Sequence, residues 1–217
     1  MYKLLFLITF GWLLFVSSAR ADHHIQWEVK GGAFHPNSPT FRKIYHDFQG
    51  IYSFEMSANI YPHLYGWMST GYLLSKGYSL EQKYPTSVQY VPVGTGLSCK
   101  IPVIDYVDFY LGAGILAGYV QVQNHSPFIE DASKWAVGGI FKLKFLIQLP
   151  SSIFLDIFSD YSIMQFRFNN TQGGTIVPQT GDVSGFSFGL GIGYQYDYYT
   201  FLNKNSKENS TEKMLEN

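Results

Sequence analysis

One segment near the C-terminus alternates between large apolar side chains and small or polar ones over about fifteen residues, Ser184–Tyr198. Successive side chains of a β-strand point to opposite faces, so this segment predicts a strand with one apolar face and one small, polar face. The apolar face carries Phe186, Phe188, Leu190, Ile192, Tyr194, Tyr196 and Tyr198. An apolar face of this length that ends in tyrosines is typical of a strand that crosses a membrane.

The N-terminus predicts export. Lys3 precedes an apolar run, Leu4–Val16, and the small-residue sequence Ala19-Arg20-Ala21 follows it. This order of a basic, an apolar and a small-residue region is that of a signal peptide, and the run is too short to span a membrane as a helix. We therefore expect residues 1–21 to be a signal peptide that is cleaved after Ala21.

The composition also favours a membrane protein. Aromatic residues make up 18% of the chain and charged residues 14%, whereas about a quarter of a soluble domain is usually charged. Removal of the signal peptide takes Lys3 and Arg20 from the 15 basic residues, and with 16 acidic residues the mature net charge becomes −3. This charge gives no basic surface for nucleic acid. Cys99 is the only cysteine, so an internal disulfide and a thiolate metal cluster are excluded.

The rest of the chain repeats the alternating pattern, which predicts eight strands. They are Ile25–His35, Phe48–Tyr61, Leu64–Gly77, Val88–Lys100, Tyr106–Gln121, Lys134–Gln148, Ser152–Phe168 and Val183–Tyr199. The connections alternate between long (Pro36–Asp47, Tyr78–Ser87, Val122–Ser133, Asn169–Asp182) and short (Pro62–His63, Ile101–Asp105, Leu149–Ser151). Outer-membrane barrels have an even number of antiparallel strands, short periplasmic turns and longer extracellular loops. The sequence thus predicts an all-β fold, an eight-stranded antiparallel up-and-down transmembrane β-barrel over residues 22–202. A polar tail, 203–217, is expected to be disordered.

A soluble barrel of the lipocalin type is the main structural alternative, because its strands alternate as well. A lipocalin carries its large apolar residues inside. The glycines that alternate with the large apolar residues favour the membrane barrel, since a lipocalin interior needs bulky side chains around its cavity.

Charged residues follow the small, polar face of the predicted strands. They are Glu28, Lys30, Glu55, Lys100, Asp108, Lys142, Lys144, Asp156 and Asp160. A lysine that faces lipid at mid-membrane costs about 2–4 kcal/mol, so we expect these side chains to point inward and to pair with one another. An eight-stranded interior is filled by side chains, which favours a structural ion-pair network over a gated ion path. The segment Leu64–Gly77 shows no clear polar face, and the alternation after Ser162 indicates a bulge.

The short connection Leu149–Ser151 predicts a register. A three-residue turn pairs Gln148 with Ser152, which places Lys144 opposite Asp156 on the inner face, close enough for an ion pair.

These features resemble the small outer-membrane β-barrel proteins, the group that contains the OmpA transmembrane domain, OmpX and OmpW. The sequence Gly191-Ile-Gly-Tyr194-Gln-Tyr196 is similar to the assembly signal of that group, with Gly191, Tyr194 and Tyr196 at its glycine and aromatic positions. The aromatic residue usually ends the protein in that group, whereas about twenty residues follow it here. The resemblance implies the outer membrane of a Gram-negative cell envelope, with lipid, lipopolysaccharide and the barrel-assembly machinery as partners.

An enzyme that modifies lipid A is one alternative, since some small outer-membrane barrels are such enzymes. They need a histidine base beside a serine. His125 and Ser126 are adjacent, so on an extended chain they point to opposite faces. His23 and His24 lack further residues at metal-ligand spacing. We therefore expect no catalytic, cofactor-binding or metal-binding residues.

The expected function is a structural or surface-interaction role, with the long loops extracellular and able to meet host molecules or ligands. A narrow, porin-like channel for small solutes, as in the OmpW group, is the other alternative.

The last predicted strand can be tested directly. Replacing both Tyr194 and Tyr196 by Asp is expected to block membrane insertion, because both side chains are predicted at the lipid–water rim within the assembly signal. Fractionation of cells that express the variant measures insertion. Deletion of residues 203–217 is the control and should leave insertion unchanged; normal insertion of the double variant would contradict the assigned role.

Overall fold

The computed structural model of the protein describes residues 24–80, 83–124, 131–172 and 175–197. The predicted signal peptide, 1–21, and the predicted tail, 203–217, lie outside these residues. Among the described residues, no helix is long and apolar enough to cross a membrane.

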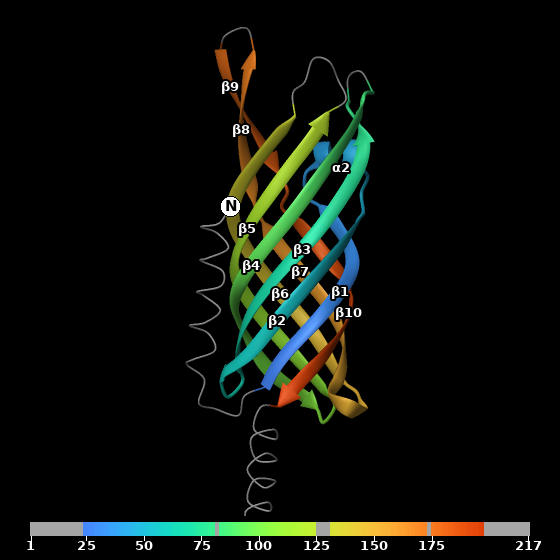
Figure 1. Cartoon of the computed structure of the whole chain (residues 1–217), viewed down its shortest axis with the longest axis vertical. Coiled ribbons are helices and arrows are strands. Elements are labelled where there is room, and N and C mark those ends of the chain that lie inside the picture. The colour runs from blue at the N-terminus through green and yellow to red at the C-terminus, as the bar shows by residue number, and fades with distance from the viewer. Residues whose placement is uncertain (1–23, 81–82, 125–130, 173–174, 198–217) are drawn as a thin grey trace, which may run out of the picture.

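Eight antiparallel strands form a closed barrel (Figure 1). They are β1 (His24–Pro36), β2 (Gln49–Tyr61), β3 (Leu64–Tyr78), β4 (Pro85–Ile104), β5 (Val107–Asn124), β6 (Ala132–Gln148), β7 (Ile153–Ile163) and β10 (Gly185–Asp197). Each strand pairs with its neighbour along the chain, and β1 closes the ring by pairing with β10 from His24 opposite Asp197 to Pro36 opposite Gly185. The predicted eight-stranded antiparallel up-and-down barrel is confirmed.

The first long connection contains a short helix, α2 (Pro39–Tyr45), where the sequence predicted only a polar loop. Ser38 caps the helix, since its hydroxyl accepts a hydrogen bond from the Phe41 backbone N–H at 3.3 Å. Pro39 occupies the first turn, where its missing N–H costs nothing. The helix packs against β3 so closely that a Cβ at Gly77 would collide with the Ile44 carbonyl oxygen.

The predicted seventh strand, Ser152–Phe168, is wrong beyond Ile163. There β7 ends, and a separate hairpin of β8 (Gln165–Gln172) and β9 (Thr175–Asp182) begins, projecting past the end of the barrel in Figure 1. At the break, the Ser184 hydroxyl accepts a hydrogen bond from the Met164 N–H at 2.9 Å, in the place of a strand partner. The segment Asn169–Asp182, predicted as a loop, therefore belongs largely to paired strands.

The predicted register of β6 and β7 is also wrong, by two residues. Gln148 lies opposite Phe154, so Lys144 faces Phe158 and not Asp156. The turn is longer than expected because a 3-10 helix, Pro150–Ser152, fills it with Ser151 at φ 70°. A shift of two residues preserves the alternation, so Lys144 still points inward.

Large apolar side chains cover the outside of the barrel. Val137, Leu190 and Ile115 are 72%, 66% and 63% exposed, and many others on the outer face exceed a third. This arrangement is opposite to that of a lipocalin, which keeps its large apolar residues inside. A continuous exposed apolar surface is expected only where lipid or a partner covers it.

Inside the barrel, glycines of one strand make room for aromatic rings of another. Trp67 of β3 is 1% exposed and lies across four glycines of β4 and β5. A Cβ at Gly96 or Gly114 would lie 2.7 or 2.6 Å from Cζ2 of this indole. Phe154 rests against Gly193 in the same way. The inward glycines thus hold bulky interior side chains and do not border an open lumen.

This packing predicts different effects on stability for valine substitutions at two glycines, Gly114 and Gly139. Gly114→Val should destabilise the barrel by about 1–3 kcal/mol or prevent folding, because the added atoms overlap Trp67 and the Thr95 carbonyl. Gly139→Val is the control, because a Cβ there meets only the Gly114 carbonyl oxygen at 3.9 Å. Urea unfolding followed by gel mobility measures both. Equal stability of the two variants would contradict the packing.

Candidate functional site in the barrel interior

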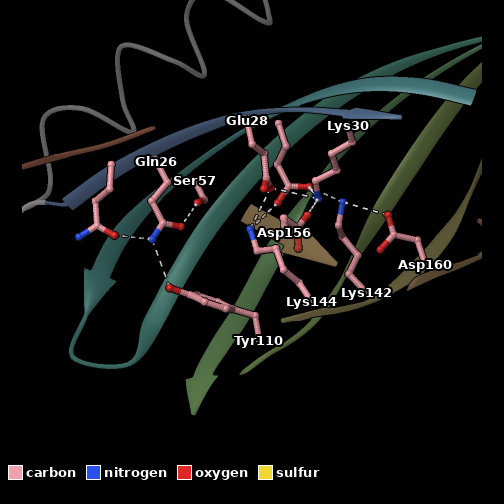
Figure 2. Close-up of polar contacts among 11 residues, drawn as sticks. Gln26, Glu28, Lys30, Ser57, Tyr110, Lys142, Lys144, Asp156 and Asp160 are labelled. Carbon is pink, nitrogen blue, oxygen red and sulfur yellow. Dashed lines mark hydrogen bonds and ion pairs between the residues drawn. The ribbon is translucent and has the colours of Figure 1, made fainter. Parts of the chain in front are cut away.

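Three lysines and four carboxylates meet at the centre of the barrel (Figure 2). We call this set the ionic layer; it consists of Glu28, Lys30, Glu55, Lys142, Lys144, Asp156 and Asp160. Glu55 of β2 contacts all three ammonium groups: Lys30 at 3.1 Å, Lys144 at 3.3 Å and Lys142 at 2.5 Å. The residues come from β1, β2, β6 and β7, so the layer ties opposite walls of the barrel together.

Lys30 also contacts two further acids of the ionic layer. Its ammonium group lies 3.0 Å from Glu28 Oε1 and 3.3 Å from Asp156 Oδ2. Lys144 also reaches Glu28, at 2.9 Å, and Lys142 reaches Asp160, at 3.4 Å. All three lysines are at least nine-tenths buried, so each ammonium group depends on these carboxylates for compensation.

Each lysine of the ionic layer also lies over an aromatic ring. The ammonium of Lys142 is 4.5 Å from the ring centre of Trp67, that of Lys144 is 5.1 Å from Tyr110, and that of Lys30 is 5.2 Å from Phe158. A desolvated cation over such a ring gains about 2 kcal/mol. The rings therefore fill the space between charges and contribute to their compensation.

A polar layer lies below the ionic layer, toward the short turns. Gln26 donates to the Tyr110 hydroxyl at 3.2 Å and accepts from the Ser57 hydroxyl at 3.1 Å (Figure 2). Closer to the barrel end, Lys100 pairs with Asp108 at 2.8 Å. Tyr65, Tyr110, Leu146 and Phe154 form a buried cluster in this half of the interior.

The opposite half of the interior, toward the long connections, is apolar. Phe34, Leu73, Tyr90, Val120 and Met164 belong to a buried cluster there. The sequence predicted an interior filled by polar and charged side chains, and for this half the prediction is wrong. The cluster draws on β1, β3, β4, β5 and β6 and on the segments that flank the β8–β9 hairpin.

Helix α2 covers this apolar cluster at the barrel mouth. Tyr45 is buried, and its hydroxyl lies 3.1 Å from the Thr86 hydroxyl. Burial raises the pKa of this phenol, so it stays protonated. Gln49 and Ser75 donate hydrogen bonds to the Tyr45 carbonyl oxygen, which fixes the end of the helix over the mouth.

A cavity of about 50 Å³ remains between the ionic layer and the apolar cluster. Its polar lining includes Ser53, Ser162, Lys142 and Asp160, and its apolar lining includes Leu116. A cavity of this size with several polar groups has room for a few water molecules. The cavity borders the ionic layer and the apolar cluster and interrupts neither.

The nine predicted interior charges all lie in the barrel wall with their side chains inward. Seven form the ionic layer, and Lys100 and Asp108 form the separate pair. The predicted ion pair between Lys144 and Asp156 is wrong, because the register shift gives Asp156 to Lys30 and Lys144 to the two glutamates. The aromatic partners Trp67, Tyr110 and Phe158 were missed; the inward glycines were the only signal for them.

The residues of the predicted assembly signal lie in β10. Gly191 points inward between Lys30 and Asp156 and leaves room for that pair. Tyr194 and Tyr196 point outward, and Tyr194 stacks near Trp27 of β1 with ring centres 6.0 Å apart. No three His, Cys, Asp or Glu side chains of the described ranges are arranged to hold a metal ion. His125 and Ser126 lie outside the described residues.

Comparison with known proteins gives matches in structure alone. No protein-family description matches the chain, and neither does any curated protein. The outer membrane protein OprG from Pseudomonas aeruginosa aligns with a TM-score of 0.61 at 10% identity, covering 83% of this chain and 99% of OprG. Neisserial surface protein A aligns at 0.53 and 12% identity, covering 81% and 98%. Ail, the attachment invasion locus protein of Yersinia pestis, aligns at 0.50 and 13%, covering 80% and 97%.

The chain has the fold of the small eight-stranded outer-membrane barrels. Identities this low show the fold and leave the role to the residues of this chain. The alignments cover 97–99% of these three neighbours.

Removing the central carboxylate tests the ionic layer. Glu55→Gln should destabilise the barrel by about 3–5 kcal/mol, because it leaves three buried lysines with one negative charge fewer. Lys134→Gln, at an exposed position, is the control and should change stability by less than about 0.5 kcal/mol. Urea unfolding in micelles measures both. A Glu55→Gln barrel as stable as the control would show that the layer is not the centre of the fold.

Proposed function

We propose that this protein is an integral outer-membrane barrel that conducts no ions and serves to anchor and display its extracellular loops. The observation that carries the proposal is the closed interior. The ionic layer spans the lumen from wall to wall, and the apolar cluster under α2 fills the half above it. Eight strands leave an interior just wide enough for side chains, and here side chains occupy it.

Location in the outer membrane is supported by the outer surface and by the fold. Large apolar side chains cover the outer face, and aromatic side chains lie near both ends, with Trp27 and Tyr196 at one end and Tyr72 and Trp135 toward the other. This pattern matches the lipid band and aromatic girdles of outer-membrane barrels. The cleaved signal peptide expected at residues 1–21 is the proposed means of export.

A surface role is supported by the way the long connections are built. The connections at one end carry α2 and the β8–β9 hairpin, whereas those at the other end are short turns. We place the structured end outside the cell, as in other outer-membrane barrels. The crystal structure of Ail was determined in complex with the heparin analogue sucrose octasulfate. That fold can therefore bind a ligand, and we propose a comparable binding role for the structured end here, with host molecules or other ligands as partners.

The narrow-channel and enzyme alternatives find less support in this chain. A channel needs a continuous polar path, and the apolar half of the interior interrupts one. An enzyme on lipid A needs a histidine and a serine within hydrogen-bond reach. Of the described histidines, His35 is engaged by Arg42 and the Asp47 carbonyl, and neither contact involves a serine.

Planar-bilayer recording tests the proposal. The refolded wild-type protein should show no steady openings. A variant with less bulk in the ionic layer, Glu55→Ala with Lys142→Ala and Trp67→Ala, should show none either, because the other five residues of the layer and the apolar cluster still fill the lumen. Steady single-channel openings of the wild type would contradict a closed interior and favour the solute channel.

A further inference from the structure

A row of aromatic side chains encircles part of the outer rim, at the end that carries α2. His35, Phe186 and Tyr161 are paired neighbours on β1, β10 and β7, and Phe48, directly before β2, lies against His35 with ring centres 5.0 Å apart. Phe48 is 59% exposed and Phe186 41%. Phe188 lies directly below the row and also faces outward at 42% exposure. Such a row marks the boundary between acyl chains and headgroups.

Arg42 of α2 reaches over the rim to this row. Its Nη1 lies 2.9 Å from His35 Nε2, while His35 Nδ1 lies 2.8 Å from the Asp47 carbonyl oxygen. Because a carbonyl only accepts, Nδ1 carries the proton and Nε2 accepts from the guanidinium. The imidazole is further held by the Phe48 ring, with centres 5.0 Å apart. His35 is thus a positioning residue that fixes the guanidinium above an apolar surface.

Most N–H donors of this guanidinium have no partner among the described residues. A guanidinium has five N–H donors, and within the described part of the chain its only side-chain hydrogen bond is to His35. The nearest acid, Asp47, is 71% exposed with Oδ1 at 3.9 Å from Arg42 Nε, too far for a hydrogen bond. Lys43, next on α2, is exposed. The site therefore presents positive charge, together with a planar fork that suits a phosphate.

We propose that this rim binds the phosphate of an anionic outer-leaflet lipid, with Arg42 on the phosphate and the acyl chains along Phe48, Phe186 and Phe188. Two independent features of the barrel select a lipid as the occupant. The guanidinium of Arg42 complements an anionic headgroup. The aromatic surface directly below it is continuous with the apolar belt and suits acyl chains. A lipid with an anionic head and acyl chains matches both features. The inference rests on the outer-membrane location proposed above.

Native mass spectrometry of the full chain in micelles with added lipid A tests the site. The wild type is expected to retain lipid A, Arg42→Gln to weaken retention at least about threefold, and Arg42→Lys to fall between them, because lysine keeps the charge but loses the fork. Lys134→Gln removes the same charge on β6 and should retain lipid A like the wild type. Equal losses in Arg42→Gln and Lys134→Gln, or none in Arg42→Gln, would overturn the site.

A second variant keeps the proposal testable if Arg42→Gln fails to fold. Asp47→Asn removes only an exposed acid near Arg42 and should strengthen retention about twofold, within the range of exposed charge pairs; unchanged or weaker retention would overturn the site. Inorganic phosphate added as a competitor should not displace lipid A, because it lacks acyl chains; displacement would assign the site to free anions instead.

Heat-dependent gel mobility separates the two proposals. A wild-type chain that folds as a heat-modifiable barrel but retains no lipid A would refute the lipid site alone. A wild-type chain that yields only a soluble, non-heat-modifiable protein would refute the membrane location and the lipid site together.

Discussion

The carboxylate of Glu55 lies among three lysine ammonium groups in the middle of the barrel, and the rest of the interior is arranged around it. A buried lysine without a counter-charge is strongly unfavourable. The three lysines of β1 and β6 therefore require a carboxylate beside them, and Glu55 of β2 provides it. The remaining acids of the ionic layer compensate the outer sides of the same lysines. A network of this kind specifies one mutual placement of four strands, which alternation alone does not.

Packing around the ionic layer follows a second constraint, the fixed width of an eight-stranded ring. Large rings can enter the lumen only where the facing wall has no side chains. Trp67, Phe154 and Phe158 each lie against inward glycines of other strands. Two of these rings and Tyr110 also adjoin the charged and polar groups, so apolar packing and charge compensation use the same side chains. The closed interior assigned to the anchor role follows from this shared packing.

Alternation along the sequence predicts the number of strands, the faces of most strands and the inward direction of the nine charges. A single sequence shows this alternation because each strand has one side toward lipid and one toward the lumen. The partners of those charges do not follow from alternation. They depend on register, and the register of β6 and β7 depends on a turn in which Ser151 adopts a positive φ that its sequence does not signal. Trp67 was missed because β3 is apolar on both faces. The β8–β9 hairpin was missed because the Ser184 hydroxyl, which bonds the Met164 backbone at the break, lies twenty residues further along the chain.

The pairing of the buried charges is the most direct test of this account. Solid-state NMR of the barrel in lipid bilayers, with labelled lysine nitrogen and carboxylate carbon atoms, reports which groups are in contact. The account predicts a strong coupling between Lys144 Nζ and the carboxylate of Glu28, which are 2.9 Å apart, and couplings from all three lysines to Glu55. A coupling of Lys144 to Asp156 in place of Glu28, or no coupling from any lysine to Glu55, would contradict it.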